Sequence, residues 1–147
     1  MIAVRVQIEP FDAAAEVASL SAGRTDVGGV VSFTGIVRAD DNLTALTLEH
    51  YPAMTVRAMT TVAAEAEARW PLTGGIIVHR VGRLLPGEPI VLVAVASAHR
   101  TAAFQAAEFL IDWLKTKAPF WKREEVCGEA RWVVAKVSDD DAAARWS

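Results

Sequence analysis

The sequence predicts an α+β fold: a single domain with a mostly antiparallel, mixed sheet flanked by about three helices. Its 147 residues suffice for one domain with a substantial core and leave little room for a second. Hydrophobic residues make up 52% of the chain and charged residues 22%, the composition of a globular rather than a disordered protein. Segments with the period of strands and of helices both occur, without the strict alternation that builds a parallel sheet. We therefore expect one domain over residues 1–147, with residues 138–147 as a tail.

Strands are expected where hydrophobic residues recur at every second position or form short runs between turn residues. Residues 2–8 alternate in this way, and further strands are expected at residues 30–38, 43–51, 76–84, 120–126 and 130–137. Residues 89–98 are apolar at both kinds of position, which favours a central strand covered on both faces. Short glycine-containing turns, residues 85–88 and 127–129, should join neighbouring strands.

Three helices complete the expected fold. Asp12 can cap a short alanine-rich helix that ends near residue 22. A second helix is expected to start at Pro52, run through Met54 to Trp70 and end at Pro71, because proline suits a helix start and cannot continue a helix. A third helix, residues 101–117, carries one apolar stripe and ends before Pro119.

The bulk properties exclude several classes of protein. A net charge of −3 gives no general attraction for nucleic acid or an anionic membrane, so any basic site must be local. Cys127 is the single cysteine, which rules out an intramolecular disulfide and suits a reducing compartment. The N-terminus lacks the pattern of a secretory signal, and the longest apolar run is far shorter than the roughly 20 residues that span a bilayer. We expect a cytoplasmic protein.

Four cations lie between Lys115 and Arg123, at the end of the third expected helix and the start of the next strand. The helix dipole favours cations at a helix C-terminus, which accounts for Lys117 without any function. Lys115, however, borders the apolar stripe, and Lys122 shares a strand face with Phe120. Two lysines that converge beside aromatic rings can act as acid, base or nucleophile. From this spacing alone, a functional cluster and a solvated surface are equally good interpretations.

A second candidate is the pair His99 and Arg100, between the central strand and the third helix. A helix N-terminus attracts anions, and these side chains would complete a phosphate site; the alternative is that His99 caps or packs while Arg100 is exposed. Arg38, taken alone, is interpreted as a solvated strand end. His50 and His79 lack the spacing of zinc ligands and are interpreted as structural.

Several segments resemble, in the same order, the large subunit of molybdopterin synthase, the MoaE family. The most specific segment runs from Ile111 through Lys115, Pro119 and Lys122 to Glu124. The other matching segments are Phe33 to Arg38, Leu46 to Pro52, His79 to Gly82, Pro86 to Glu88, Ala98 to Arg100, Ala103 to Phe104 and Arg131 to Val133. Together they extend over about residues 30–135, and the resemblance implies the α/β-hammerhead fold of this family.

The resemblance also implies an activity and a partner. The family converts cyclic pyranopterin monophosphate to molybdopterin by building its dithiolene, a step of molybdenum cofactor biosynthesis. The sulfur arrives as a thiocarboxylate on the C-terminal Gly-Gly of a small ubiquitin-like subunit of the MoaD type, whose tail enters a pocket of the large subunit. Two large subunits form a central homodimer within a heterotetramer. The sulfur transfer itself needs no metal or organic cofactor.

Carried over residue by residue, the two active-site lysines of the family correspond to Lys115 and Lys122. The substrate-binding positions correspond to Arg38, His99, Arg100, Phe33, Glu124 and Lys136. The cations among them would hold the phosphate of the substrate. We assign Lys115 to binding and polarising the thiocarboxylate, and Lys122 to proton transfer during sulfur attack and loss of water.

The chain departs from the family at Ala53 and Val56, where glycine and glutamate are usual, and this affects a helix entry and the partner surface it forms. Two other interpretations stay open. The same basic cluster could serve a dimeric module that binds a phosphorylated metabolite without chemistry, or a structural subunit that grips the tail of a partner. A gain of sulfur in the product, measured by mass, would exclude the metabolite-binding module. Dependence of turnover on Lys122 would exclude the structural subunit.

Overall fold

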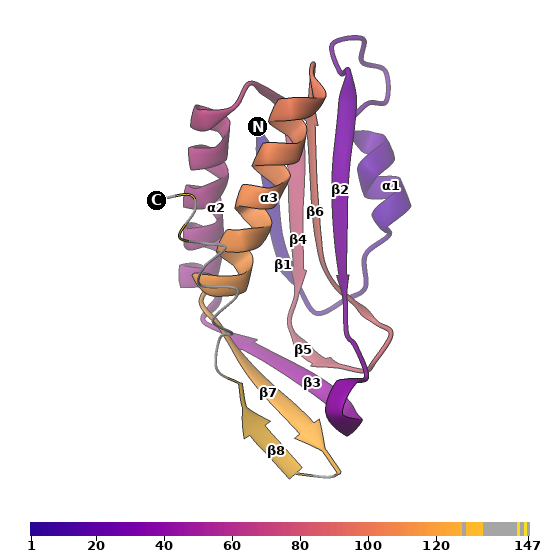
Figure 1. The fold of residues 1–147 in the computed structure, drawn as a ribbon, viewed down its shortest axis with the longest axis vertical. Helices are drawn as coiled ribbons and strands as arrows, with labels where there is room; N and C mark the ends of the chain where they lie inside the picture. The colour runs from indigo at the N-terminus through magenta and orange to yellow at the C-terminus, as the bar shows by residue number, and fades with distance from the viewer. Residues whose placement is uncertain (128, 134–143, 145, 147) are drawn as a thin grey trace.

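The computed structural model describes residues 1–127, 129–133, 144 and 146, and within them eight strands and three α-helices confirm the α+β class. The strands form two four-stranded sheets, in the orders β1-β4-β6-β2 and β5-β3-β7-β8, where the sequence suggested one (Figure 1). In chain order the elements are β1 (Ile2–Gln7), α1 (Ala13–Ser19), β2 (Gly29–Ile36), β3 (Leu43–His50), α2 (Pro52–Arg69), β4 (Leu72–Arg80), β5 (Gly82–Leu84), β6 (Pro89–Ser97), α3 (Arg100–Thr116), β7 (Phe120–Val126) and β8 (Glu129–Trp132).

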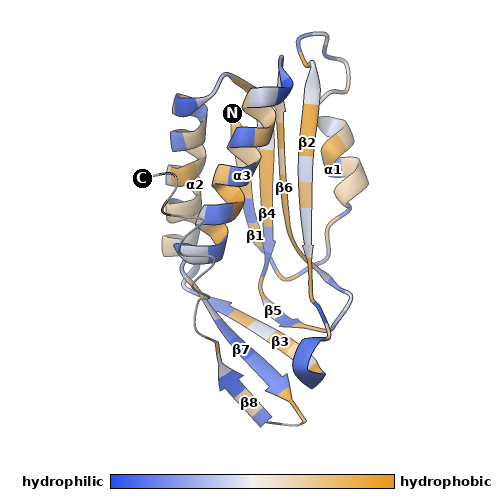
Figure 2. Ribbon diagram, in the orientation of Figure 1, coloured by the Kyte–Doolittle hydropathy of each residue, from blue (hydrophilic) through white to orange (hydrophobic). Residues whose placement is uncertain are grey.

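The first sheet forms the main core. β6 lies between β4 and β2 and is antiparallel to both, while β1 joins β4 in parallel. The even and odd positions of β6 are both buried, which confirms the prediction of a central strand: Val93 and Val95 face α2 and α3, and Leu92 and Ala94 face α1. The three helices therefore cover both faces of this sheet, and Figure 2 shows β4 and β6 as mostly hydrophobic strands between them.

The second sheet exists because the expected strand over residues 76–84 divides in two. β4 ends at Arg80, and Gly82 has a φ of +93°, a conformation that only glycine adopts without strain. β5 then pairs with β3 in the second sheet, while β4 stays in the first. The hydrophobic pattern continues across the break because Leu84 is as deeply buried as the residues of β4, so the pattern alone gave no sign of it.

A small core and one buried arginine fix the junction between the sheets. Val37, Leu48 and Leu84 form part of this core, against which Phe120 packs. Arg80 is 6% exposed, and its guanidinium donates to the carbonyl oxygen of Ile8 at 3.0 and 3.1 Å and to that of Pro89 at 3.2 Å. A buried guanidinium with several acceptors is costly to displace, so these hydrogen bonds hold the segments around Ile8, Arg80 and Pro89 together at the junction.

The ends of the helices agree with their capping residues. Asp12 caps α1, and its side chain accepts a hydrogen bond from the Ala15 amide at 3.1 Å. α2 starts at Pro52, as the sequence predicted, because proline suits the first turn of a helix. No helix of the described residues is long and apolar enough to cross a membrane.

Only part of the C-terminal prediction can be compared with the structure. Of the tail at residues 138–147, the described residues are Ala144 and Trp146. The Trp146 ring packs edge-on against Trp70, and its indole N–H donates to the Asp112 carboxylate. This side chain therefore adds to the core beside α2 and α3.

Candidate active site

Two hollows meet at the junction between the sheets. The first is a narrow crevice of about 60 Å³ with mainly apolar walls from β2, β6, α3 and β7. The second is an open cleft of about 700 Å³ edged by polar and charged side chains. Lys115 and Lys122 line both hollows, so the lysine pair predicted from the sequence stands where the crevice opens into the cleft.

Local structure explains why these two lysines converge. Lys115 is in the last turn of α3, where the helix dipole favours a cation, and the chain then turns at Pro119 into β7. Along β7 alternate side chains share a face, which places Lys122 beside Phe120 at the crevice and beside Glu124 at the cleft. Lys122 pairs with Leu48 on β3, and this register fixes the position of Lys122 in the second sheet.

His79 lines the same crevice as the two lysines, a position that its strand pattern did not reveal. The alternation of β4 places its side chain on the face covered by α2 and α3, and it is 6% exposed and lines the crevice. Its ring stacks on Phe120 with centroids 4.0 Å apart and planes at 20°. Its Nδ1 lies 2.8 Å from the carbonyl oxygen of Arg80. The available signal was its place in the matching segment His79 to Gly82.

Burial lowers the pKa of His79 to about 4, and the positive charges of Lys122 and Lys115 and the neighbouring His50 act in the same direction. The hydrogen bond to the Arg80 carbonyl acts in the opposite direction but is outweighed. The imidazole in the crevice is therefore neutral near pH 7.

This neutral histidine should make the stability of the fold depend on pH. The unfolded chain takes up a proton near pH 6.5, whereas the folded chain resists it down to about pH 4, so the free energy of unfolding should fall as the pH falls through this window. The shift corresponds to a loss of about 3 kcal/mol between the two values. Urea unfolding at several pH values would measure it, and a His79→Gln variant should lack this component. An equal pH dependence in that variant would contradict the assignment.

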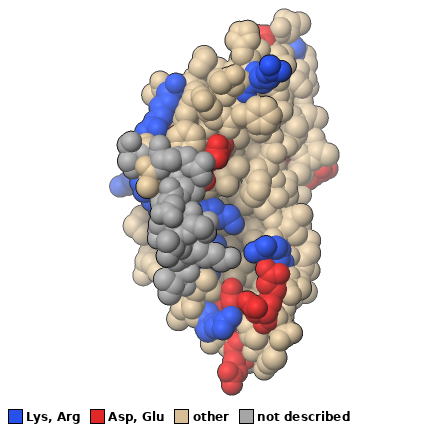
Figure 3. Space-filling view, in the orientation of Figure 1, with Lys and Arg blue, Asp and Glu red and all other residues tan. Residues whose placement is uncertain are grey.

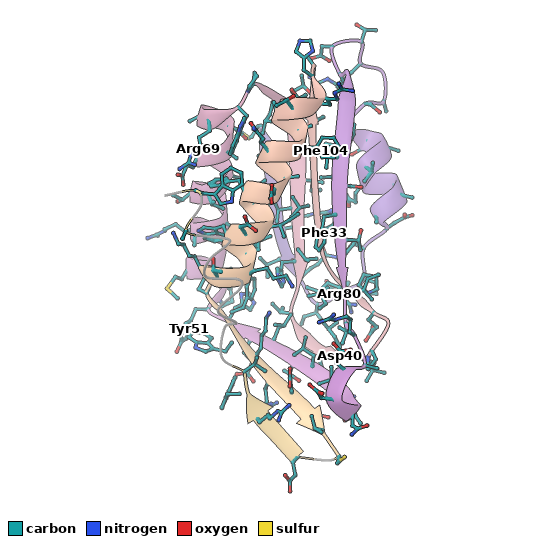
Figure 4. The ribbon with its side chains drawn as sticks, viewed as in Figure 1. Phe33, Asp40, Tyr51, Arg69, Arg80 and Phe104 are labelled. Carbon is teal, nitrogen blue, oxygen red and sulfur yellow. The ribbon has the colours of Figure 1, made fainter. Side chains whose placement is uncertain are left out.

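The wide cleft brings Arg38 and Glu124 to the lysines. Arg38 follows β2, is exposed, and forms an ion pair with Asp40 at 3.1 Å. Glu124 pairs with Arg131 at 3.2 Å, and Arg131, which the sequence did not single out, also lines the cleft. Figure 4 shows Asp40 near the junction of the sheets, and Figure 3 shows cations and anions gathered over this lower part of the face. An anionic ligand in the cleft could replace Asp40 as the partner of Arg38, or Glu124 as the partner of Arg131.

His99 and Arg100 are not part of this arrangement within one chain. They stand at the N-terminal end of α3, which has 17 residues, so about 24 Å of helix separates them from Lys115. Both are exposed, and the His99 side chain does not cap the helix. Within a single copy of the chain, His99 and Arg100 therefore do not lie with the lysines, and their assignment to the phosphate stays a prediction.

Two predicted site residues remain, Phe33 in the crevice and Lys136 in a part of the chain that the structure does not describe. Phe33 lines the crevice and is 36% exposed. Lys136 lies outside the described residues. Among the residues that the structure describes, no three His, Cys, Asp or Glu side chains are grouped so that they could hold a metal ion.

Gly35 keeps the crevice open, and a side chain at this position should narrow it. A Cβ at this position would stand 2.7 Å from Val91 Cγ1 and 3.4 Å from a ring carbon of Phe33, and all three residues line the crevice. If the tail of a small subunit enters this crevice, as the family resemblance implies, Gly35→Ala should lower the affinity for that subunit about tenfold or more, with a cost to stability of about 1–3 kcal/mol. Titration calorimetry and thermal unfolding would measure the two effects. Gly29→Ala on the same strand is the matched control, because its Cβ would meet no atom within 4 Å.

Comparison with known proteins identifies the family of the chain. Residues 6–117 match the family model described as MoaE protein. The chain belongs to the MoaE family. It is 55% identical over 146 residues to the molybdopterin synthase catalytic subunit of Mesorhizobium japonicum, covering 97% of this chain and 92% of that protein.

Solved structures share the fold along nearly the whole chain. The molybdopterin biosynthesis MoaE protein of Burkholderia ambifaria is 49% identical with a TM-score of 0.85, covering 99% of this chain and 98% of that one. A molybdopterin synthase chain of Staphylococcus aureus is 32% identical with a TM-score of 0.78, covering 88% and 95%. The family model includes Lys115 and ends before Lys122, whereas the full-length relatives extend over β7 as well.

Proposed function

We propose that the chain is the catalytic subunit of a molybdopterin synthase and that sulfur transfer occurs between Lys115 and Lys122. The observation that carries this proposal is the meeting of two unlike hollows at these lysines. The open cleft has the volume of a small-molecule site, about 300–1,000 Å³ in general, and suits a pterin phosphate. The crevice is too narrow for such a molecule and suits an extended chain without side chains, as in a Gly-Gly terminus.

The two lysines have different roles in the proposed reaction, Lys115 in binding the sulfur donor and Lys122 in proton transfer. A thiocarboxylate that emerges from the crevice ends beside Lys115, whose ammonium binds and polarises it. Its sulfur then forms a bond to a carbon of the pterin side chain as an oxygen leaves that carbon as water, and Lys122 transfers the proton that this step needs. Water then cleaves the bond between this sulfur and the acyl carbon of the small subunit, whose terminus leaves as a carboxylate. Arg38 binds the phosphate at the cleft rim.

The small subunit and a second copy of the chain complete the assembly that we propose. The relatives are named catalytic subunits, which implies a further subunit, and we take it to be the ubiquitin-like sulfur carrier. His99 and Arg100 are exposed and about 24 Å along α3 from the lysines, so they can reach a site only in another copy. A homodimer would bring them to the phosphate of the neighbouring site.

Reconstitution tests this function directly. The chain, a small subunit ending in a Gly-Gly thiocarboxylate and cyclic pyranopterin monophosphate should yield molybdopterin with two added sulfurs by mass spectrometry. Binding of both partners without a gain of sulfur would instead favour a non-catalytic module that uses the same basic cluster. The unmodified carboxylate form of the small subunit is the control.

A further inference from the structure

His79 is the one imidazole that the crevice encloses among the described residues, and the sulfur-transfer step outlined above gives it no role. It is held on two sides, by the ring stack on Phe120 and by the Arg80 carbonyl oxygen at Nδ1. His50 on β3 pairs with Phe120 on β7, and the centroids of the His50 and Phe120 rings are 6.0 Å apart. The orientation of the His79 ring is thus fixed by the fold.

These contacts determine which nitrogen of His79 carries the proton. A carbonyl oxygen can only accept, so Nδ1 must donate to Arg80. A neutral imidazole has one N–H, which leaves Nε2 with a free lone pair. The Lys115 ammonium from α3 and the Lys122 ammonium from β7 line the crevice together with His79, and these two groups and His50 from β3 act on the ring electrostatically. All three groups can donate a hydrogen bond, and Lys122 has the strongest electrostatic interaction with the ring.

We propose that His79 is a positioning residue of the site, whose Nε2 accepts a hydrogen bond from the Lys122 ammonium and holds it toward the mouth of the crevice. This inference rests on the proposed function, because it concerns the proton-transferring lysine. A neutral acceptor suits the task better than a carboxylate, since it orients the ammonium without forming an ion pair that would hold the proton on the lysine. The burial of His79 keeps that acceptor uncharged where substrates bind.

Two amide substitutions separate the acceptor from the other contacts of the ring. Asn at position 79 can replace the Nδ1–H donor but has no atom near Nε2, whereas Gln can place its oxygen near Nε2; both remove the stack on Phe120. His79→Asn should reduce kcat for sulfur transfer by about tenfold to a hundredfold, the effect of one hydrogen bond to a charged group, with KM for the small subunit unchanged. His79→Gln should retain kcat within about threefold of the wild type. Equal losses in the two variants, or a loss confined to KM, would overturn the proposal.

A second measurement does not depend on activity. In ¹⁵N-labelled protein near pH 7, the ring of His79 should be the Nδ1–H tautomer, and Lys122→Met should shift its Nε2 resonance. Lys117→Met, at an exposed position near the same helix end, should leave that resonance in place. An Nε2–H tautomer, or an unchanged Nε2 resonance in Lys122→Met, would refute the inference. Absence of sulfur transfer in the wild type would instead refute the proposed function, and the spectrum would still test the hydrogen bond.

Discussion

Replacing Lys122 with alanine is expected to reduce dithiolene formation by about a hundredfold to ten-thousandfold, the usual contribution of a general acid or base. The side chain is half-buried where the crevice meets the cleft. No other lysine of β7 lines either hollow and could transfer the proton in its place. The fold should survive, because Lys122 lies outside the hydrophobic clusters. Single-turnover assays with the thiocarboxylated small subunit would measure the loss of the chemical step.

The matched variants show whether charge or proton transfer is lost. Lys122→Arg keeps a positive charge that cannot be given up near neutral pH, so it should be nearly as inactive as the alanine variant. Lys115→Ala should impair both turnover and binding of the thiocarboxylate terminus. Lys117→Ala, two residues further along and exposed, should be fully active. Normal dithiolene formation in either the Lys115 or the Lys122 alanine variant would remove the proposed mechanism.

Mixing two inactive variants is expected to restore activity. If the lysines of one copy act with Arg100 of the other, a mixed dimer of Lys122→Ala and Arg100→Ala chains contains one intact site and one doubly defective site. Random reassembly makes about half of the dimers mixed, so about a quarter of the wild-type activity should return. Each variant alone should stay near its own low level, because each site then lacks one of the two groups.

The arrangement of sites in the dimer decides the outcome of this experiment. A site formed within one chain would give no recovery from the two single variants. It would also give about half of the wild-type activity when wild type is mixed with the double variant, whereas a shared site would give about a quarter. Size-exclusion chromatography of the mixture confirms that dimers have reassembled.

Several features of the fold could be predicted because they depend on local patterns. Asp12 as a cap, Pro52 at a helix start and the apolar run of β6 each carry their structural cause in a few neighbouring residues. The division of the chain after Arg80 could not be predicted in this way. It depends on the positive φ of Gly82 and on which strand each half finds as a neighbour.

The candidate site shows the same division. The cluster from Lys115 to Arg123 was visible in the sequence because helix end and strand start are adjacent along the chain. The place of His79 was not, since a histidine in a buried strand has the same local pattern whether it packs against aliphatic side chains or faces two ammonium groups.

The sequence by itself determined the fold class, the order of the elements and the presence of a lysine pair between the end of α3 and the start of β7. These follow from hydrophobic periodicity, capping and the alternation of side chains, which act over a few residues. The tertiary structure alone decided that the strands form two sheets, that His79 joins the lysines, and that His99 and Arg100 do not. Those outcomes depend on contacts between residues far apart in the chain and on the rigid length of α3, which local patterns do not encode.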